Sequence, residues 1–509
     1  MDQTIGSNNN RIAKNTLFLY VRMLIIMLVT FYTSRVYLQV LGETDFGIYN
    51  IVGGVILLLS FISSSLATST QRFLNYEMGK GRDEEMGKVF SSSMIIYLLF
   101  SLLFILIGET IGLWFLNTQM NIPTERMVAA NWVYQFSLLG FVVNMLRVPY
   151  HATIIATERM SFYASFSILE AVLKLSVVFI LLYWGNIDKL VVLSILTFMV
   201  FGLITFFYKI YCNRHFSFSH FHWMWNKSML KRLVSFSGWS LLGSSANMGA
   251  TQGVNIIVNL FCGVTVNAAI GIATQLIYGL YQFVANFQVA YNPQLVKLYA
   301  SGQQQEFMNL IFRSSKFSYL LLLLIAVPFI LCMDFILEIW LGTPPEYTEE
   351  FCNLIMIFLL VDAVAAPLYL SVQAVGKIKH YQMLVSILIF LNLPLSYVAL
   401  KFGLSPLSVW AIKVLINIIV FFVRVYFLKR LINLSIASYF KKVLLPLSLI
   451  TLFTFLIPSL LNGYYDNWIN LFVVALTSTI SILLFAYIIG LDRNEKLFVA
   501  AIIKRRINR

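Results

Sequence analysis

The sequence predicts an all-α polytopic membrane protein with fourteen transmembrane helices, arranged as two pseudo-symmetric six-helix lobes plus two C-terminal helices. Three observations predict this fold class: the composition, the distribution of Lys and Arg, and an internal repeat. Hydrophobic residues make up 59% of the 509 residues and charged residues only 11%, with a mean hydropathy of +0.81. An average soluble domain has about 25% charged residues, so this chain has too few polar side chains to cover a soluble particle.

Apolar stretches long enough to cross a bilayer alternate with short polar loops along the whole chain. The polar first fifteen residues contain no short apolar core with a small-residue cleavage site, so we expect no cleavable signal peptide. The predicted spans are 15–40, 47–70, 89–116, 128–147, 162–184, 190–210, 233–260, 266–290, 317–341, 351–375, 381–400, 407–428, 442–462 and 468–490.

The Lys and Arg residues predict the orientation, because loops on the cytoplasmic side are enriched in these residues. With the N-terminus inside, the inner segments contain 28 of them, whereas the outer loops contain only Arg126, Lys189 and Lys401. Both termini are therefore predicted in the cytoplasm, and the membrane is expected to be the bacterial inner membrane. This distribution also explains the net charge of +14 without a nucleic-acid partner.

An internal repeat divides the chain into two halves of parallel topology. A common offset pairs the segment at 149–163 with 367–381, and a nearly equal offset pairs two further segments. Two such halves related by an axis along the membrane normal are a common transporter plan. The matched residues are Pro149/Pro367, Ala156/Ala374, Arg159/Lys377, Tyr163/Tyr381, Gly42/Gly263, Gly81/Gly302 and Glu85/Glu306. The predicted parts are a cytoplasmic tail (1–14), an N-terminal lobe (15–232), a C-terminal lobe (233–441), helices 13–14 (442–490) and a basic cytoplasmic tail (491–509).

Two charged residues lie inside the predicted fifth span, in the stretch SILEAVLKLSVV. Glu170 and Lys174 are four residues apart, so they share one face of a helix in the favourable order. Charges in a span usually face a bundle interior or a wet cavity and are functional candidates. Two interpretations remain: the pair neutralises itself between packed helices, or it lines a cavity where a substrate anion or a proton competes for the pairing.

Other ionisable residues in spans have alternative explanations. Arg22, Arg35 and Lys413 are candidates for binding an anion in the cavity, although each could instead extend its side chain to an interface. Arg424 is near the inner end of its span, which favours extension to the interface. Asp362 is a candidate for coupling to an ion, and a buried hydrogen bond to a neighbouring helix is its alternative.

The predicted seventh span is rich in Gly, Ser, Asn and Gln. Small residues allow close helix packing, which is one explanation. The other is a polar cavity wall, in which Asn247, Gln252 and Asn255 form hydrogen bonds with sugar hydroxyl groups.

The sequence resembles the Wzx-type lipid-linked oligosaccharide flippases, the polysaccharide-transport branch of the multidrug/oligosaccharidyl-lipid/polysaccharide (MOP) exporter superfamily. The resemblance covers the whole length in its span count and lobes. It is carried by SRVYLQVLGETDFGIYNIVGG (34–54), STQRFLNYEMGKGRDEEMGKVFSSS (69–93) and RVPYHATIIATERMSFYA (147–164).

The resemblance implies a non-enzymatic protein that moves an undecaprenyl-diphosphate-linked oligosaccharide from the inner to the outer leaflet by alternating access, for surface polysaccharide synthesis such as O-antigen, lipopolysaccharide or capsule. By the same resemblance, Arg35 and Asp45 match an arginine and an aspartate that matter in related lipid II flippases, although the spacing here differs slightly. We expect no cofactor, and the expected partners beside the lipid-linked oligosaccharide are membrane lipids, a polysaccharide polymerase and chain-length machinery. We expect a monomer.

Two other functions compete with this one. An ion-coupled small-molecule exporter of the same superfamily would be expected to bind cations through acidic groups, whereas the deep charges here are mostly basic. A membrane polysaccharide polymerase would need a large outer loop or a catalytic cluster, and the sequence shows no convincing one. His215, His220 and His222 follow a basic aromatic loop and are explained better as an interfacial belt than as a metal site.

Overall fold

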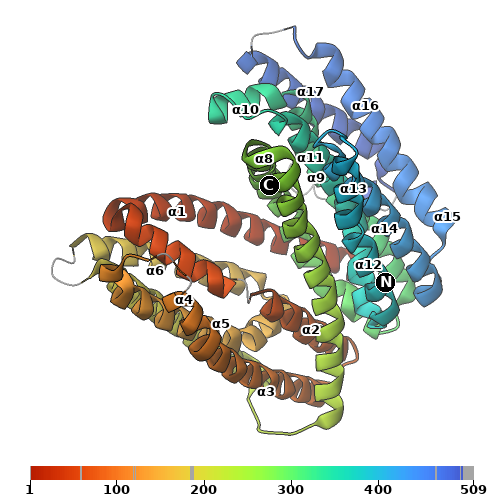
Figure 1. The fold of residues 1–509 in the computed structure, drawn as a ribbon. Helices are drawn as coiled ribbons and strands as arrows, with labels where there is room; N and C mark the ends of the chain where they lie inside the picture. Colours follow the sequence, from red (N-terminus) through yellow and green to blue (C-terminus); the bar gives the residue numbers. More distant parts are fainter. Residues whose placement is uncertain are drawn as a thin grey trace, which may run out of the picture. The chain divides into compact units, whose positions relative to one another are not determined.

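The computed structural model describes residues 2–57, 60–118, 120, 122–183, 188–464, 467–492 and 495–496. These residues form helices and connecting turns, without a β-strand among them (Figure 1). The chain folds as two compact units, which we call the amino-terminal unit (Ile12–Leu241) and the carboxy-terminal unit (Met1–Arg11 with Leu242–Arg509). The boundary lies inside one long helix, α8 (Lys227–Ala300).

Twelve helical segments in the described part of the chain are long and apolar enough to cross a membrane, and each overlaps one predicted span. The multi-pass fold is therefore confirmed, while the count of fourteen and the orientation stay predictions. Of the two remaining predicted spans, 233–260 is helical within α8 but is rich in polar residues. The other, 47–70, includes positions outside the described residues.

The amino-terminal unit is built around α5, which packs against α2, α3, α6 and α7. Its helices are α1 (Asp2–Leu57), α2 (Ser60–Gly79), α3 (Asp83–Ile107), α4 (Leu113–Thr118), α5 (Met127–Ala156), α6 (Met160–Tyr183) and α7 (Lys189–His215), with short helical turns at Gly108–Gly112, Thr124–Arg126 and Ser217–Ser219.

The carboxy-terminal unit repeats this arrangement around α11, which packs against α9 and α14, while α16 and α17 pack together and α17 contacts α9. Its helices after α8 are α9 (Gln304–Leu331), α10 (Met333–Leu341), α11 (Thr348–Val375), α12 (Lys379–Phe390), α13 (Asn392–Lys401), α14 (Ser408–Ile432), α15 (Ile436–Tyr439), α16 (Leu445–Leu461) and α17 (Asn467–Phe485), with π-helical turns at Phe440–Leu444 and Ala486–Gly490.

Backbone bends confirm the internal repeat. Gly42 interrupts α1 with φ 77° and ψ 172°, and its predicted counterpart Gly263 interrupts α8 with φ 79° and ψ −177°. This backbone region is essentially restricted to glycine, so the same residue is needed at both bends. Gly81 and Gly302, the second predicted pair, also share a positive φ, of 66° and 75°.

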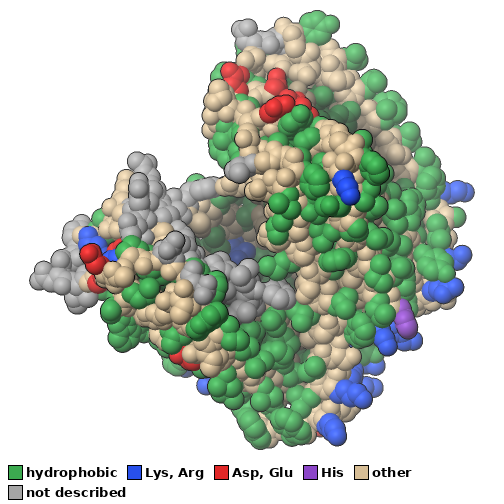
Figure 2. All heavy atoms as spheres, viewed as in Figure 1, with side chains coloured by type: hydrophobic (Ala, Val, Ile, Leu, Met, Phe, Trp, Pro, Cys, Tyr) green, Lys and Arg blue, Asp and Glu red, His purple; other side chains and the backbone are tan. Residues whose placement is uncertain are grey.

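The surfaces of both units are strongly apolar. Large side chains such as Leu106, Ile387 and Phe472 are exposed by 57%, 59% and 67%, and hydrophobic side chains cover much of the visible surface in Figure 2. Soluble monomers rarely expose continuous apolar patches of this kind. A lipid environment explains the exposure, because hydrocarbon chains replace water around these helices.

Candidate functional site

The amino-terminal unit contains an ion-pair triad around Glu170. The predicted pair with Lys174 forms along one face of α6, with 2.9 Å between Nζ and Oε1. A third member comes from α5, because Nη1 of Arg147 lies 2.8 Å from Oε2 of the same carboxylate. Both oxygens of Glu170 are thus engaged, and its side chain is only 18% exposed. Arg147 is the last residue of the predicted span 128–147 and was not among the predicted cavity residues.

A second cationic group, Arg22 of α1, lies close to the aromatic residues that surround this triad. Its guanidinium carbon is 4.4 Å from the centre of the Tyr163 ring, and its buried Nε has no hydrogen-bond partner among the described residues. Tyr163 lies edge-on to His151 at 5.0 Å. The Tyr208 ring lies between the rings near Arg22 and the Glu170 triad, since it is 6.3 Å from His151 and 5.6 Å from the guanidinium of Arg147.

This cluster has an excess of positive charge. Arg22, Arg147 and Lys174 provide three cationic groups, and Glu170 provides one carboxylate. A flat ring face can hold a cation by cation–π attraction while leaving its N–H donors available. Lys174 has such a contact with Phe201, at 4.8 Å. The arrangement is suited to holding an anion that can compete with Glu170 for these cations.

The carboxy-terminal unit contains a cavity of about 380 Å³ with an ionic centre at Asp362. Oδ2 of Asp362, in α11, accepts a hydrogen bond of 2.9 Å from the hydroxyl of Tyr281 in α8. That hydroxyl accepts a hydrogen bond of 2.9 Å from Gln288. On the other side, Oδ1 lies 3.7 Å from Nη1 of Arg424 in α14.

Arg424 is buried, with 9% exposure. The predicted extension of its side chain to the inner interface is therefore wrong, because Asp362 and two tyrosines hold the guanidinium inside the unit. Its Nε donates a 3.1 Å hydrogen bond to the hydroxyl of Tyr381, and the Tyr369 ring lies 5.6 Å away. Its Nη1 makes no hydrogen bond within the part of the chain that the structure describes.

Lys413 also lines this cavity. Its ammonium group lies 4.0 Å from the Trp410 ring and 5.3 Å from the Phe358 ring. Among the described residues, no carboxylate forms an ion pair with it. The side chain therefore contributes a cation held by aromatic faces and not by an opposite charge.

The structure brings together only some of the predicted cavity residues. Asn247 lines the carboxy-terminal cavity together with Lys413 and Asp362. Gln252 and Asn255, further along α8, are not among its lining residues, and Gln252 is exposed. The side chain of Arg35 lies outside the described residues.

The repeat contained a signal for the aromatic residues His151 and Tyr369, which were not among the predicted site residues. The offset that pairs Tyr163 with Tyr381 also pairs His151 with Tyr369. Both pairs of rings are adjacent in the structure, at 5.0 Å and 6.3 Å, and an arginine contacts each pair. Tyr281 had no comparable signal.

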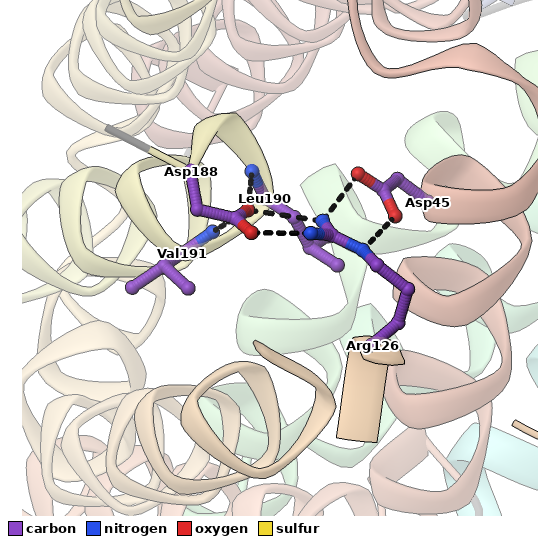
Figure 3. A network of polar contacts seen from close by, with 5 residues as sticks. All are labelled: Asp45, Arg126, Asp188, Leu190 and Val191. Atoms are coloured by element: carbon purple, nitrogen blue, oxygen red, sulfur yellow. Dashed lines mark hydrogen bonds and ion pairs between the residues drawn. The ribbon is translucent and has the colours of Figure 1, made fainter. Parts of the chain in front are cut away.

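Asp45 belongs to a separate ion-pair network in the amino-terminal unit, shown in Figure 3. Arg126 donates from Nε at 2.8 Å and from Nη2 at 2.5 Å to the two oxygens of Asp45. It also pairs with Asp188, whose carboxylate caps α7 by accepting hydrogen bonds from the backbone N–H groups of Leu190 and Val191. Partial burial raises the pKa of Asp188, but hydrogen bonding to Arg126 and its positive charge outweigh this effect and lower the pKa below its usual range. Both oxygens of Asp45 are occupied here, and its role in substrate binding stays a prediction.

The fold is similar to solved structures of MATE transporters. An outward-facing multidrug resistance MATE family transporter of the MOP superfamily gives a TM-score of 0.69 at 14% identity, covering 82% of this chain and 96% of that chain. MATE in complex with MaD3S gives 0.72 at 14% identity, with 84% and 96% covered. A MOP superfamily transporter from Pyrococcus furiosus, described as having a binding pocket of reverse polarity that suggests a different function, gives 0.69 at 13% identity, with 82% and 96% covered.

A search of curated protein sequences found no match. The profile of one family, described as polysaccharide biosynthesis protein, matches residues 12–301, which is more than half of the chain. The matched region contains the whole amino-terminal unit and extends through the bend at Gly263 to the end of α8. The chain therefore belongs to the polysaccharide biosynthesis protein family, and its fold is that of the MOP superfamily transporters.

Proposed function

We propose that this protein is a flippase that moves a polyprenyl-diphosphate-linked oligosaccharide from the inner to the outer leaflet of the bacterial inner membrane. The family match supports a role in polysaccharide biosynthesis, and the multi-pass fold supports transport. The cationic cluster around Glu170 is the observation that carries the proposal.

The charge of this cluster complements a diphosphate that joins a lipid to a sugar. Such a diester has one negative charge on each phosphate, and Arg22, Arg147 and Lys174 together exceed Glu170 by two positive charges. Arginine offers a planar set of donors to phosphate oxygens, and lysine offers a mobile point charge. Moving an anion into a low-dielectric span is costly unless it is paired, so the cluster would lower the barrier for the headgroup.

Glu170 pairs with two cations of the cluster when no cargo is bound. Without cargo, its carboxylate neutralises Arg147 and Lys174 at 2.8 Å and 2.9 Å. An arriving diphosphate would compete for both cations, and its release would restore the original pairs. With cargo bound, the two charges of the diphosphate and that of Glu170 would together balance the three cations, which lowers the cost of uncompensated charge inside the membrane. We expect alternating access driven by an ion gradient or the membrane potential, with Asp362 as the candidate ion-coupling residue.

The test is transport by the full-length protein in proteoliposomes. Undecaprenyl diphosphate bearing a labelled sugar is placed in one leaflet, and its appearance in the other is followed with a membrane-impermeant sugar-modifying reagent. Lys174→Met should slow translocation at least about tenfold, the effect of losing roughly 1.4 kcal/mol of charge-assisted binding. Lys231→Met, which removes an exposed lysine of the same unit, should transport normally.

The competing exporter is tested in the same vesicles. Accumulation of a cationic dye, combined with no movement of the lipid-linked sugar, would favour small-molecule export and reject the flippase. Normal translocation by Lys174→Met would reject the cluster as the diphosphate site.

A further inference from the structure

The cavity of the carboxy-terminal unit differs chemically from the cationic cluster. Its volume of about 380 Å³ is within the range of small-molecule pockets, roughly 300–1,000 Å³. Amide and phenol groups make up much of its polar lining, including Asn247, Asn392, Asn417, Tyr278 and Tyr281. Such groups both donate and accept hydrogen bonds, as sugar hydroxyl groups do, and the phenol rings add flat apolar faces.

Two buried hydrogen-bond donors on residues of this lining have no acceptor among the described residues. Asn392 is 2% exposed, and its Nδ2 has no hydrogen-bond partner in the described residues. Arg424 is 9% exposed and its Nη1 is likewise unsatisfied by a hydrogen bond. Lys413 lies over two aromatic rings and forms no ion pair with any described carboxylate. Leaving buried donors unsatisfied costs about 1–3 kcal/mol each, so a ligand rich in acceptor atoms would be stabilised here.

The net charge of the cavity lining indicates how much negative charge a bound ligand should have. Arg424 and Lys413 contribute two cations and Asp362 one carboxylate, so the lining has an excess of one positive charge. A group with a single negative charge neutralises this excess. A diphosphate would add two negative charges beside the carboxylate of Asp362, and such like-charge contact is unfavourable.

We propose that this cavity binds an acidic sugar of the oligosaccharide, with its carboxylate at Lys413, the cation of the lining that no described carboxylate pairs with. The inference rests on the proposed function, because it assigns a sugar class to the cargo of that flippase. Neutral polar groups around the ionic centre contact the hydroxyl groups of the same sugar, so the carboxylate determines the preference over a neutral sugar.

Binding of D-glucuronate and D-glucose to the full-length protein in detergent tests this assignment, because these sugars differ only at the carboxylate-bearing carbon. Saturation-transfer NMR measures both dissociation constants. Glucuronate should bind at least about tenfold more tightly than glucose, and Lys413→Met should abolish this preference. Lys413→Arg should keep it, whereas Asn392→Asp, which replaces a donor with a negative charge, should weaken it. Lys401→Met removes an exposed lysine of α13 that is not on the cavity lining, and should change nothing.

Inorganic pyrophosphate is the probe that separates this inference from the proposed function. It should not displace glucuronate, and its own binding should depend on Lys174 and not on Lys413. Equal binding of glucuronate and glucose, or an unchanged preference in folded Lys413→Met, would overturn the acidic-sugar site. Displacement of glucuronate by pyrophosphate in a Lys413-dependent manner would overturn it too, since the cavity would then be a diphosphate site. Lipid translocation by Lys174→Met tests only the proposed function.

Discussion

Replacing Glu495 with glutamine should destabilise the carboxy-terminal unit, because it removes the charge partner of a deeply buried lysine. Lys316 of α9 is 2% exposed, and its ammonium group lies 2.7 Å from Oε2 of Glu495 and 3.0 Å from the carbonyl oxygen of Gly490. Its other carboxylate neighbour, Asp492, is 3.6 Å away and 64% exposed. The buried charge would therefore depend on one carbonyl group and one solvated carboxylate.

The magnitude follows from this geometry. Removing one partner of a buried ion pair costs about 3–5 kcal/mol. The carbonyl of Gly490 remains as an acceptor, so the lower end, about 3 kcal/mol, is expected for Glu495→Gln. Lys316→Met should cost less, since Glu495 keeps Arg313 at 3.6 Å and the backbone N–H of Asp492 at 2.8 Å.

The assay is a double-mutant cycle on detergent-purified protein, with unfolding followed by intrinsic fluorescence in denaturant. The double variant Lys316→Met/Glu495→Gln should be more stable than the sum of the single effects predicts, by about 2 kcal/mol or more. Lys496→Met, which removes a neighbouring charge outside the buried pair, serves as the control. Additive single effects would show that the two groups do not interact and would refute the reasoning.

Three further predictions concern other contacts. Asp188 has a lowered pKa in the folded protein, so its ionised carboxylate stabilises the fold above its unfolded pKa of about 3.9. This stabilisation is lost as the pH falls through the lower folded pKa. In thermal unfolding measured over a pH series, Asp188→Asn should remove this pH-dependent component, and an unchanged series would contradict the prediction. Gly42→Ala should lower the free energy of unfolding by about 1–3 kcal/mol, because alanine is strained at a positive φ. Gly47→Ala, in ordinary helical backbone with open space around it, should leave the stability unchanged. Thermal unfolding measures both variants, and equal effects would exclude backbone strain as the cause. Tyr381→Phe removes the hydrogen bond to buried Arg424 and should cost about 1.5–3 kcal/mol in chemical unfolding, and an unchanged stability would show that the guanidinium finds another acceptor.

The fold could be predicted because hydropathy and the repeat are properties of the sequence itself. Long apolar segments identify spans without knowledge of packing, and glycines at matching positions of the repeat identify equivalent positions in the two halves. The repeat thus predicted that Gly42 and Gly263 are equivalent, and the structure confirms it with the same backbone conformation.

An ion pair could be predicted only where both charged residues lie on the same helix. Glu170 and Lys174 are four residues apart, so helix geometry alone brings them together. The contact of Asp362 with Arg424 depends on how α11 and α14 are rotated against each other. Helices with apolar residues on every side give little information on rotation, and this explains why Arg424 was assigned to the interface and why Arg147 was not predicted as a partner of Glu170.

The shared bends of α1 and α8 also mean that each unit can serve as a comparison for the other at equivalent positions. At the offset of the repeat, Lys174 corresponds to Asn392 and Asp362 to Asn144, so the two units have related backbones with different charges. Exchanging side chains between such counterparts would alter the electrostatics of one unit while keeping a residue type that its sister unit already tolerates at that position. Chimeras of this kind would separate what the scaffold contributes from what individual charges contribute.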